Sequence, residues 1–293
     1  MQQFSKDNFG IGWRPEIAPG IFIYREHIDF VEVIAEDWYH YKTASKSALA
    51  TLAANIPVTL HGVSMGLASG ERIQQKRIDN IARLYDSIRP LFWSEHLCFT
   101  RAGEFEIGHL AAPPRTQQNI GGFIDNIEAV RRTLGADPLL ENIATLIEPP
   151  GSEMTEGDWT ARSLDAANCN LLLDLHNLYA NALNRGADPF CSLREMPVER
   201  VRAVHLAGGR WIGAGGNQQK LLDDHLHSVP DICYELLEEL GALAPQPLFV
   251  SIERDGRFPP FLQLLGEIDR ARQSLAHGRD RAGAACTPSS LKI

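Results

Sequence analysis

Histidine and carboxylate residues recur at matching places along the chain, each at or near the carboxyl end of a short apolar run. They are His61, His96, Glu141, Asp174, His205 and Glu253. Asp223 and His225 lie close together in the segment before the last of these runs. Imidazole nitrogens and carboxylate oxygens are ligands that iron, manganese and zinc take in proteins. The pattern therefore predicts a metal centre with nitrogen and oxygen ligands, without separating these three metals.

Taken singly, each residue has an ordinary structural explanation. A lone histidine in a strand is more often a hydrogen-bonded core residue than a ligand, and a carboxylate at a strand end often caps the next helix. The set is harder to explain in this way, because four carboxylates brought together would repel one another and could not all stay ionised without cations. The four are Glu141, Asp174, Asp223 and Glu253. The supply of ligands exceeds the need of one metal, so we expect two or three ions.

The elements that must position these residues appear as an alternation of strand-like and helical segments. Eight short runs are largely apolar on both faces, as parallel strands covered by helices are. They span residues 9–13, 30–36, 57–62, 92–99, 138–143, 170–177, 201–208 and 247–255. Helical patterns lie at residues 71–88, 116–135, 231–241 and 261–272, and Gly135 and Gly241 are expected to end two of these helices. The alternation predicts an α/β fold, a (β/α)8 TIM barrel, with an open doubly wound sheet as the alternative.

The composition is ordinary for a soluble globular protein, with 44% hydrophobic and 22% charged residues. We expect one domain over residues 1–276 and a disordered tail over residues 277–293. A net charge of -9 disfavours a large surface for nucleic acid. No run is typical of a membrane span or a signal peptide, so we expect a cytoplasmic protein. The five scattered cysteines are expected to be free thiols.

One glycine-rich segment, GGRWIGAGGNQQK at residues 208–220, stands between the seventh and eighth predicted strands. Its lysine lacks the GK[ST] context of a phosphate-binding loop. We expect a mobile loop over the mouth of the barrel that acts as a lid or contacts a peptide.

The ordered series of ligand types resembles the trinuclear zinc site of the endonuclease IV-like barrels, which hydrolyse phosphodiesters at abasic DNA. That group has histidine three residues after the aspartate, whereas this chain has Asn177. The local sequences are more similar to the multinuclear non-haem iron-dependent oxidative enzymes, which include the methanobactin oxidase and the peptidyl-cysteine enzyme of 3-thiaglutamate biosynthesis. The motifs, in order between residues 9 and 272, are LHGVSMGLASG, WSEHLCF, LLENIATL, LLLDLHNLYANAL, VHLAGG, LLDDHLHSVP and SIERDG.

This resemblance implies a barrel that holds two or three iron ions in mixed Fe(II)/Fe(III) states and uses O2 as co-substrate. The implied metal-binding residues are His61, His96, Glu141, Asp174, Asn177, His205, Asp223, His225 and Glu253. Asp174, His176 and Asn177 are expected nearest to the reaction. His176 is either a further ligand or a hydrogen-bonded neighbour of the ligands.

The resemblance also implies a substrate, a cysteine in a ribosomally synthesised precursor peptide, and a small partner protein that binds the leader peptide and forms a heterodimer. Two reactions are known in the family: excision of the cysteine β-carbon, which we favour, and formation of an oxazolone with a neighbouring thioamide. Two other classes stay open. One is a metal-dependent hydrolase of the endonuclease IV-like class, and the other is a metal-binding module without turnover.

Overall fold

Eight parallel strands close into a barrel in the computed structural model, which describes residues 4–39, 43–213 and 219–285. The order around the barrel is β1-β12-β9-β8-β7-β4-β3-β2. The strands are Asn8–Gly12 (β1), Phe30–Ile34 (β2), Val58–Gly62 (β3), Trp93–His96 (β4), Leu139–Glu141 (β7), Asn170–Asp174 (β8), Val201–Leu206 (β9) and Phe249–Ile252 (β12). Each lies within one of the eight predicted runs or starts one residue before it. The predicted (β/α)8 barrel is confirmed, and the open sheet is wrong.

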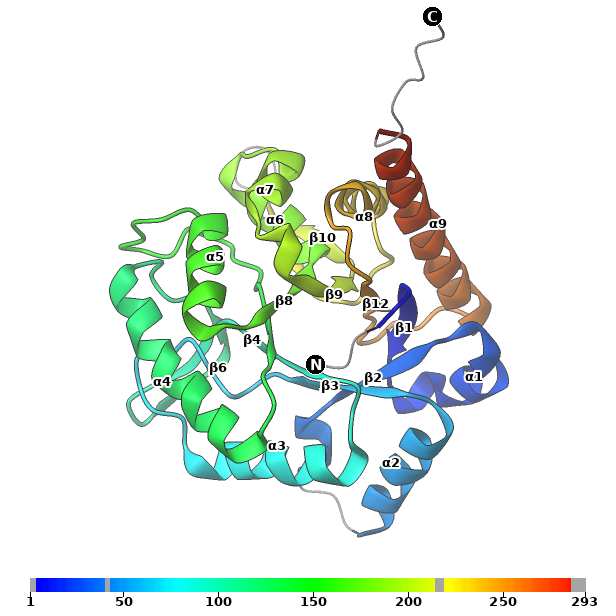
Figure 1. The fold of residues 1–293 in the computed structure, drawn as a ribbon, viewed down its shortest axis with the longest axis horizontal. Coiled ribbons are helices and arrows are strands. Elements are labelled where there is room, and N and C mark those ends of the chain that lie inside the picture. Colours follow the sequence, from blue (N-terminus) through cyan, green and yellow to red (C-terminus); the bar gives the residue numbers. More distant parts are fainter. Residues whose placement is uncertain (1–3, 40–42, 214–218, 286–293) are drawn as a thin grey trace, which may run out of the picture.

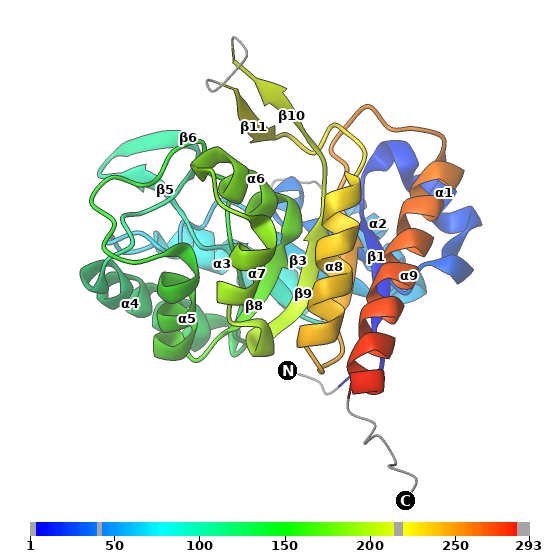
Figure 2. The ribbon, with the colours of Figure 1, turned by 90° about the horizontal axis from the view of Figure 1, so that it is seen from above.

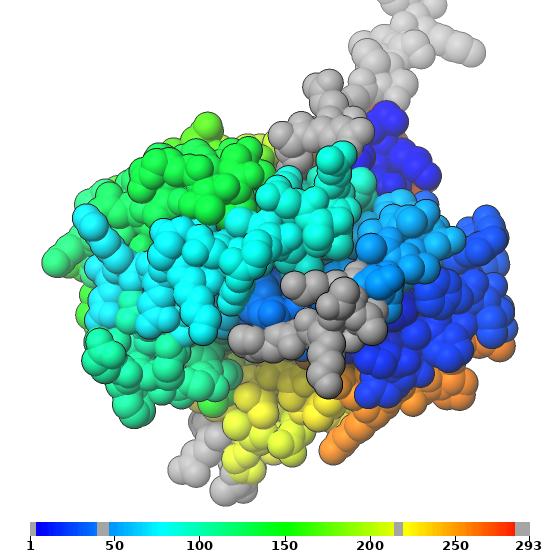
Figure 3. All heavy atoms as spheres, turned by 90° about the horizontal axis from the view of Figure 1, so that it is seen from below, coloured from blue at the N-terminus to red at the C-terminus, as the bar shows by residue number. Residues whose placement is uncertain are grey.

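Helices follow the strands and form the outer layer of the barrel (Figure 1). They are Ala18–Ile23 (α1), Thr43–Asn55 (α2), Gln75–Ile88 (α3), Gln117–Leu134 (α4), Glu156–Ala167 (α5), Leu175–Arg185 (α6), Pro189–Glu195 (α7), Asp231–Leu243 (α8) and Phe261–Ala285 (α9). Short 3-10 turns occupy Pro15–Ile17, Arg25–His27, Glu36–Trp38 and Val198–Arg200. On the side seen in Figure 3, atoms coloured blue to cyan, from the first third of the chain, form much of the surface.

The ends of two helices differ from the sequence prediction. Gly135 ends α4 with a left-handed φ of 67°, as predicted. Gly241 instead lies inside α8, where a Cβ atom would be 2.8 Å from the carbonyl oxygen of Leu275 on α9. Close packing of α8 on α9 therefore explains this glycine. Residues 277–285, expected to be disordered, are helical and extend α9, while residues 286–293 lie outside the described residues.

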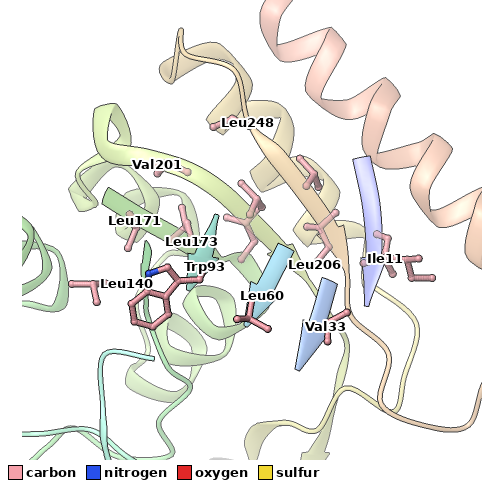
Figure 4. Packing of buried hydrophobic residues seen from close by; sticks show 14 of the residues in the cluster. Ile11, Val33, Leu60, Trp93, Leu140, Leu171, Leu173, Val201, Leu206 and Leu248 are labelled. Atoms are coloured by element: carbon pink, nitrogen blue, oxygen red, sulfur yellow. The ribbon is translucent and has the colours of Figure 1, made fainter. Parts of the chain in front are cut away.

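The apolar core has two parts. The larger part fills the space between the strands and the helices, and Figure 4 shows Ile11, Leu60, Trp93 and Leu173 within it. The smaller part is a cluster of Phe30, Phe92, Leu139, Leu172, Ala203 and Phe249. Side chains of a strand alternate between its two faces. Each residue of this cluster therefore faces the inside of the barrel, as does the residue two places after it in the same strand.

This alternation determines where the polar residues lie. Leu172 is followed two residues later by Asp174, and Ala203 by His205. The apolar cluster thus fills the amino end of the barrel lumen, with the rings of Phe30 and Phe249 5.3 Å apart. The inward-facing residues further toward the carboxyl ends of the strands include the predicted ligands Glu141, Asp174 and His205.

Two antiparallel hairpins were not predicted. One joins Phe99–Ala102 (β5) to Phe105–Ala111 (β6), and the other joins Gly209–Ile212 (β10) to Lys220–Asp223 (β11). Figure 2 shows both hairpins at the same end of the barrel. The expected loop at residues 208–220 therefore includes paired strand residues at 209–212 and 220, and residues 214–218 lie outside the described residues.

Over residues 4–39, 43–213 and 219–285, none of the helices has the length and apolar character needed to cross a membrane. Cys98, Cys169, Cys191 and Cys233 are free thiols, as predicted for them.

Candidate metal centre

The carboxyl ends of the barrel strands bring six predicted ligands into two overlapping groups. The first is His61, His96 and Glu141, and the second is Glu141, Asp174, His205 and Glu253. In each group the ligand atoms lie within 4.8 Å of one another, and all six side chains are buried. Glu141 belongs to both groups, so it lies between two potential metal positions.

Glu141 uses its two oxygens in two directions. Its Oε2 atom is 3.4 Å from Nε2 of His61 and 3.3 Å from Nε2 of His96. Its Oε1 atom is 3.1 Å from Nδ1 of His205, which is also 3.1 Å from Oε2 of Glu253. A carboxylate placed in this way is suited to bridge two cations.

Asp223 and His225, from the segment that follows β10, join the cluster through Glu253. Nε2 of His225 is 2.9 Å from Asp223 Oδ2, and its Nδ1 is 3.5 Å from Glu253 Oε2. His225 has a φ of 53°, which is unusual for a residue with a side chain and is often found at functional sites. Its backbone N–H donates to Gly208, and its carbonyl accepts from Asp255. These bonds hold the imidazole ring at the mouth of the barrel.

Asp174 combines helix capping with a free oxygen. Its Oδ1 caps α6 by accepting a hydrogen bond from the backbone N–H of Asn177 at 2.5 Å. Its Oδ2 is buried without a hydrogen-bond partner among the described residues. Asn142 fixes this strand end, because its amide accepts from Asp174 N and donates to Asp174 O. The capping explanation and the ligand explanation therefore involve different oxygens of one carboxylate.

Asn177 is oriented in a similar way. Its Nδ2 donates to the carbonyl oxygen of Asn142 at 3.0 Å. The Oδ1 atom is left buried, with no hydrogen bond inside the described part of the chain. An amide oxygen without a donor in a buried site is available as a metal ligand.

His176 faces Asp223. Its Nδ1 is 2.7 Å from Asp223 Oδ1, and its ring packs against Gly209, where a Cβ atom would lie 2.5 Å from Cε1. Only 1% of His176 is exposed. Of the two predicted roles, this contact favours a hydrogen-bonded neighbour that orients Asp223.

Further polar residues contact ring nitrogens of the predicted histidine ligands and orient the rings. Ser94 Oγ is 2.8 Å from His61 Nδ1, and Glu32 Oε1 is 2.8 Å from His205 Nε2. Sequence reasoning missed Glu32, although an acidic residue in the otherwise apolar strand FVEVI was a usable signal. It also missed the buried Glu95, whose Oε1 accepts from the backbone N–H of His96.

The charges of the cluster depend on one another. Burial, together with the carboxylates of Asp223 and Glu141, raises the pKa of Asp174 well above its ordinary value. Burial alone would lower the pKa of His205, but Glu253 and the other nearby carboxylates raise it well above its ordinary value. Without cations, the site therefore needs protons to balance its carboxylates. Metal ions supply the same positive charge to deprotonated ligands.

The donor set fits metal ions on chemical grounds as well. Buried oxygens of Glu141, Asp174 and Asn177 have no hydrogen-bond partner within the described residues. Imidazole nitrogens lie beside them, and no cysteine belongs to either ligand group. Iron, manganese and zinc suit such a nitrogen and oxygen set.

A cavity of about 560 Å³ opens above the cluster. His61, His96, Asn177 and Glu253 line its floor. Its wall is mainly apolar and comes from the β5–β6 hairpin, the segment after β7, and β11. The main apolar residues of this wall are Leu110, Ala112, Ile143, Leu146, Ile147, Pro149, Pro150, Leu221 and Leu222.

Fold and site together define a (β/α)8-barrel protein with a potential metal centre at the carboxyl ends of its strands. Residues 8–276 match the family model described as RiPP precursor modification enzyme MbnB/TglH/ChrH, where RiPP denotes a ribosomally synthesised and post-translationally modified peptide. The chain belongs to this family, whose members modify precursor peptides.

Related sequences and structures agree with this assignment. A UPF0276 protein of Streptomyces avermitilis is 35% identical over 280 residues, or 93% of this chain, which spans 56% of that longer protein. A UPF0276 protein of Caulobacter vibrioides is 33% identical, over 93% of this chain and 96% of that protein. Among solved structures, L-ribulose 3-epimerase has a TM-score of 0.61 at 13% identity, covering 97% of this chain and 99% of that one. At this identity the likeness shows the fold alone.

Proposed function

We propose that the protein oxidises a cysteine in a ribosomally synthesised precursor peptide, with two or three iron ions in mixed Fe(II)/Fe(III) states and O2 as co-substrate. The main support is the pair of buried ligand groups that share Glu141 beneath an open cavity. Iron bound there would act as a Lewis acid for the cysteine thiolate and would pass electrons from the cysteine to O2.

The chain's own residues would hold and orient these ions. His61 and His96 with Glu141 form one set, and Asp174, His205 and Glu253 with Glu141 form a second. Asn177, Asp223 and His225 supply further ligands at the side of the cavity. Ser94 and His176 would orient ligands through hydrogen bonds, and Glu32 would do so through its charged contact with His205.

The entrance is arranged so that a peptide meets few unpaired charges. Arg14 lines the cavity but is paired with Asp255, and it also donates to the carbonyl oxygen of Trp13. The apolar wall lies beside the ligand-lined floor of the same cavity. A cysteine side chain of a peptide can therefore reach the floor while its neighbours stay at the rim.

Within this function we favour excision of the cysteine β-carbon over oxazolone formation. The two are separated by mass spectrometry of the peptide product, because excision removes one carbon and oxazolone formation retains all of them. We further propose that a small leader-binding partner delivers the peptide in the cytoplasm. The support for a peptide substrate is membership of the family of precursor modification enzymes.

The first test is metal analysis with Mössbauer spectroscopy on protein purified anaerobically from iron-replete cells. Two or three irons per chain, some ferrous and some ferric, are expected. Stoichiometric zinc with hydrolysis of a model phosphodiester would favour the hydrolase class instead. Metal uptake without O2 consumption in the presence of peptide and partner would favour a binding module. Conversion of the peptide at full rate without O2 would contradict the proposal.

A further inference from the structure

Two large apolar side chains are exposed on the wall of the cavity. Leu146 is 40% exposed and Ile147 is 66% exposed, and both lie in the segment between β7 and α5. Exposed apolar groups that line a cavity are typical of ligand-binding surfaces. They do not belong to the ligand cluster, and the oxidation chemistry itself does not require them.

The segment that carries them is anchored on one side by α6. Oδ1 of Asn181 accepts from the backbone N–H of Thr145 at 2.6 Å, and Nδ2 of Asn181 donates to the carbonyl oxygen of Ile143 at 2.9 Å. Asn184 donates to the carbonyl oxygen of Thr145 at 3.1 Å. Asn181 is fully buried, so these bonds fix the backbone directly before Leu146.

An ion-pair network anchors the other side. Glu148 pairs with Arg115, which is 4% exposed. Oε2 of Glu148 is also 3.0 Å from Nη1 of Arg185. Leu146 and Ile147 are therefore held between two fixed points and are exposed in a defined position. A surface that is rigid before binding loses little conformational freedom when a ligand docks on it.

The surroundings of this surface favour an apolar ligand. Leu110 of β6 and Leu222 of β11 line the same cavity, and its arginine, Arg14, is already paired with Asp255. No other lysine or arginine of the described residues lines this cavity, so an acidic side chain placed on this wall would lose water without gaining such a partner. An aliphatic or aromatic side chain would instead remove apolar surface from water.

We propose that Leu146 and Ile147 bind a large apolar side chain adjacent to the cysteine in the precursor peptide, so that the cavity selects cysteines with an apolar neighbour. This inference rests on the proposed cysteine chemistry. The wall is continuous with the ligand-lined floor in one cavity, so a cysteine can reach the floor while its neighbour lies on the wall.

The test uses short peptides with iron-loaded protein under anaerobic conditions. N-acetyl-Leu-Cys-amide and N-acetyl-Cys-Leu-amide are compared with their aspartate counterparts, and the dissociation constant is read from the thiolate-to-iron charge-transfer absorption. At least one leucine peptide is expected to bind about tenfold more tightly than its counterpart, close to the effect of burying part of one apolar side chain.

Substitutions at Leu146 and Ile147 test whether these residues cause the preference for leucine. Ile147→Ser and Leu146→Ser should each reduce the preference for leucine to a few-fold, and Ile147→Lys should reverse it in favour of aspartate. Ile23→Ser is the matched control, because Ile23 is 71% exposed on α1 and does not line the cavity. Iron content is measured for every variant, so that loss of metal is not mistaken for loss of the apolar contact.

The outcomes separate this inference from the function on which it rests. Equal binding of leucine and aspartate peptides would overturn the inference, and so would a preference for leucine that is unchanged in all three wall variants. In either case, the thiolate absorption would still support cysteine binding. Absence of the absorption with every peptide would overturn the proposed function, and this inference with it.

Discussion

The floor and the wall of the cavity are built by different parts of the fold. Floor residues lie at the ends of hydrogen-bonded strands, where Asp174 stands opposite His205 and His96 opposite Glu141 in the register of the barrel. The wall residues Leu146 and Ile147 lie on an irregular segment held by side chains of other elements. In the proposed function, the floor would set which ions can bind, and the wall would set which peptide can approach them.

The floor and the wall also differ in how strongly removal of one side chain affects the rest of the region. Floor atoms are buried and charged, so removal of one group leaves the others without compensation. Wall side chains are exposed, so their removal costs the folded protein little. Floor variants should accordingly change metal content, and wall variants should change only substrate binding.

The largest effect is expected for Glu141→Ala. Glu141 contacts His61, His96 and His205 and belongs to both ligand groups, so its loss removes a shared ligand. We expect metal affinity to fall by more than about 100-fold, beyond the range typical for residues behind the ligands. Metal analysis after dialysis measures this. Retention of full iron content by a folded Glu141→Ala variant would show that the shared position is wrong.

The floor could be predicted from sequence because strand geometry is regular. Every second residue of a barrel strand faces the lumen, so the apolar Leu172 and the ligand candidate Asp174 share one face. The same rule applied to Phe30 places Glu32 in the lumen. Glu32 was not predicted because it lies two residues before the end of β2, whereas the predicted ligands lie at or near the strand ends.

The wall could not be predicted in this way. Leu146 and Ile147 have no periodic pattern, and their position depends on Asn181, which is 36 residues beyond Thr145 in the sequence. The β10–β11 hairpin was missed because its segment is rich in glycine, which weakens the strand signal. Contacts between distant segments of this kind leave no local signature.

A second prediction concerns protons at the floor. Burial lowers the pKa of His96, but Glu141 and Glu95 raise it, with a net result of about 9, and the pKa of His205 is also raised. In metal-free protein we therefore expect these histidines to carry protons at neutral pH, which a metal ion must displace. Metal affinity should therefore rise with pH, roughly tenfold per unit for each proton displaced.

Calorimetric titration of metal-free protein in buffers of different ionisation enthalpy measures the number of protons released. At least one proton per metal is expected between about pH 6 and pH 8. An affinity that does not change with pH would mean that the cluster is not protonated in the way its contacts imply.

A smaller effect is expected for Glu32→Gln. Glu32 Oε1 lies 2.8 Å from His205 Nε2, and an amide in its place keeps the shape of the side chain but carries no charge. Metal affinity should fall by about tenfold, at the lower end for residues that orient a ligand. Glu26→Gln, at an exposed position, is the control. Equal metal affinity of the two variants would show that the charge of Glu32 does not act on His205.

His176 should matter less, because it acts on Asp223 alone. His176→Ala removes the 2.7 Å contact with Asp223, and we expect metal affinity to fall by a few-fold. His176→Asn, which can still donate a hydrogen bond, should recover part of this loss. Spectra of the iron-loaded variants provide a second measurement. If His176→Ala lost metal as severely as Glu141→Ala, His176 would be a ligand and not a neighbour of one.

The smallest effect on metal affinity is expected for Asn181→Ala. The matched variant Asn142→Ala makes it a direct test of the difference between floor and wall. Asn181 and Asn142 are both buried asparagines that bond backbone groups of a neighbouring segment, but Asn181 holds Thr145 of the wall and Asn142 holds Asp174 of the floor. Each alanine variant leaves buried backbone groups unpaired, which should lower the free energy of unfolding by about 1–3 kcal/mol. Only Asn142→Ala should also lose iron, and only Asn181→Ala should weaken the preference for the leucine peptide at full iron content. If both variants lost iron equally, floor and wall would be one coupled structure, and peptide selection could not be changed without changing the metal centre.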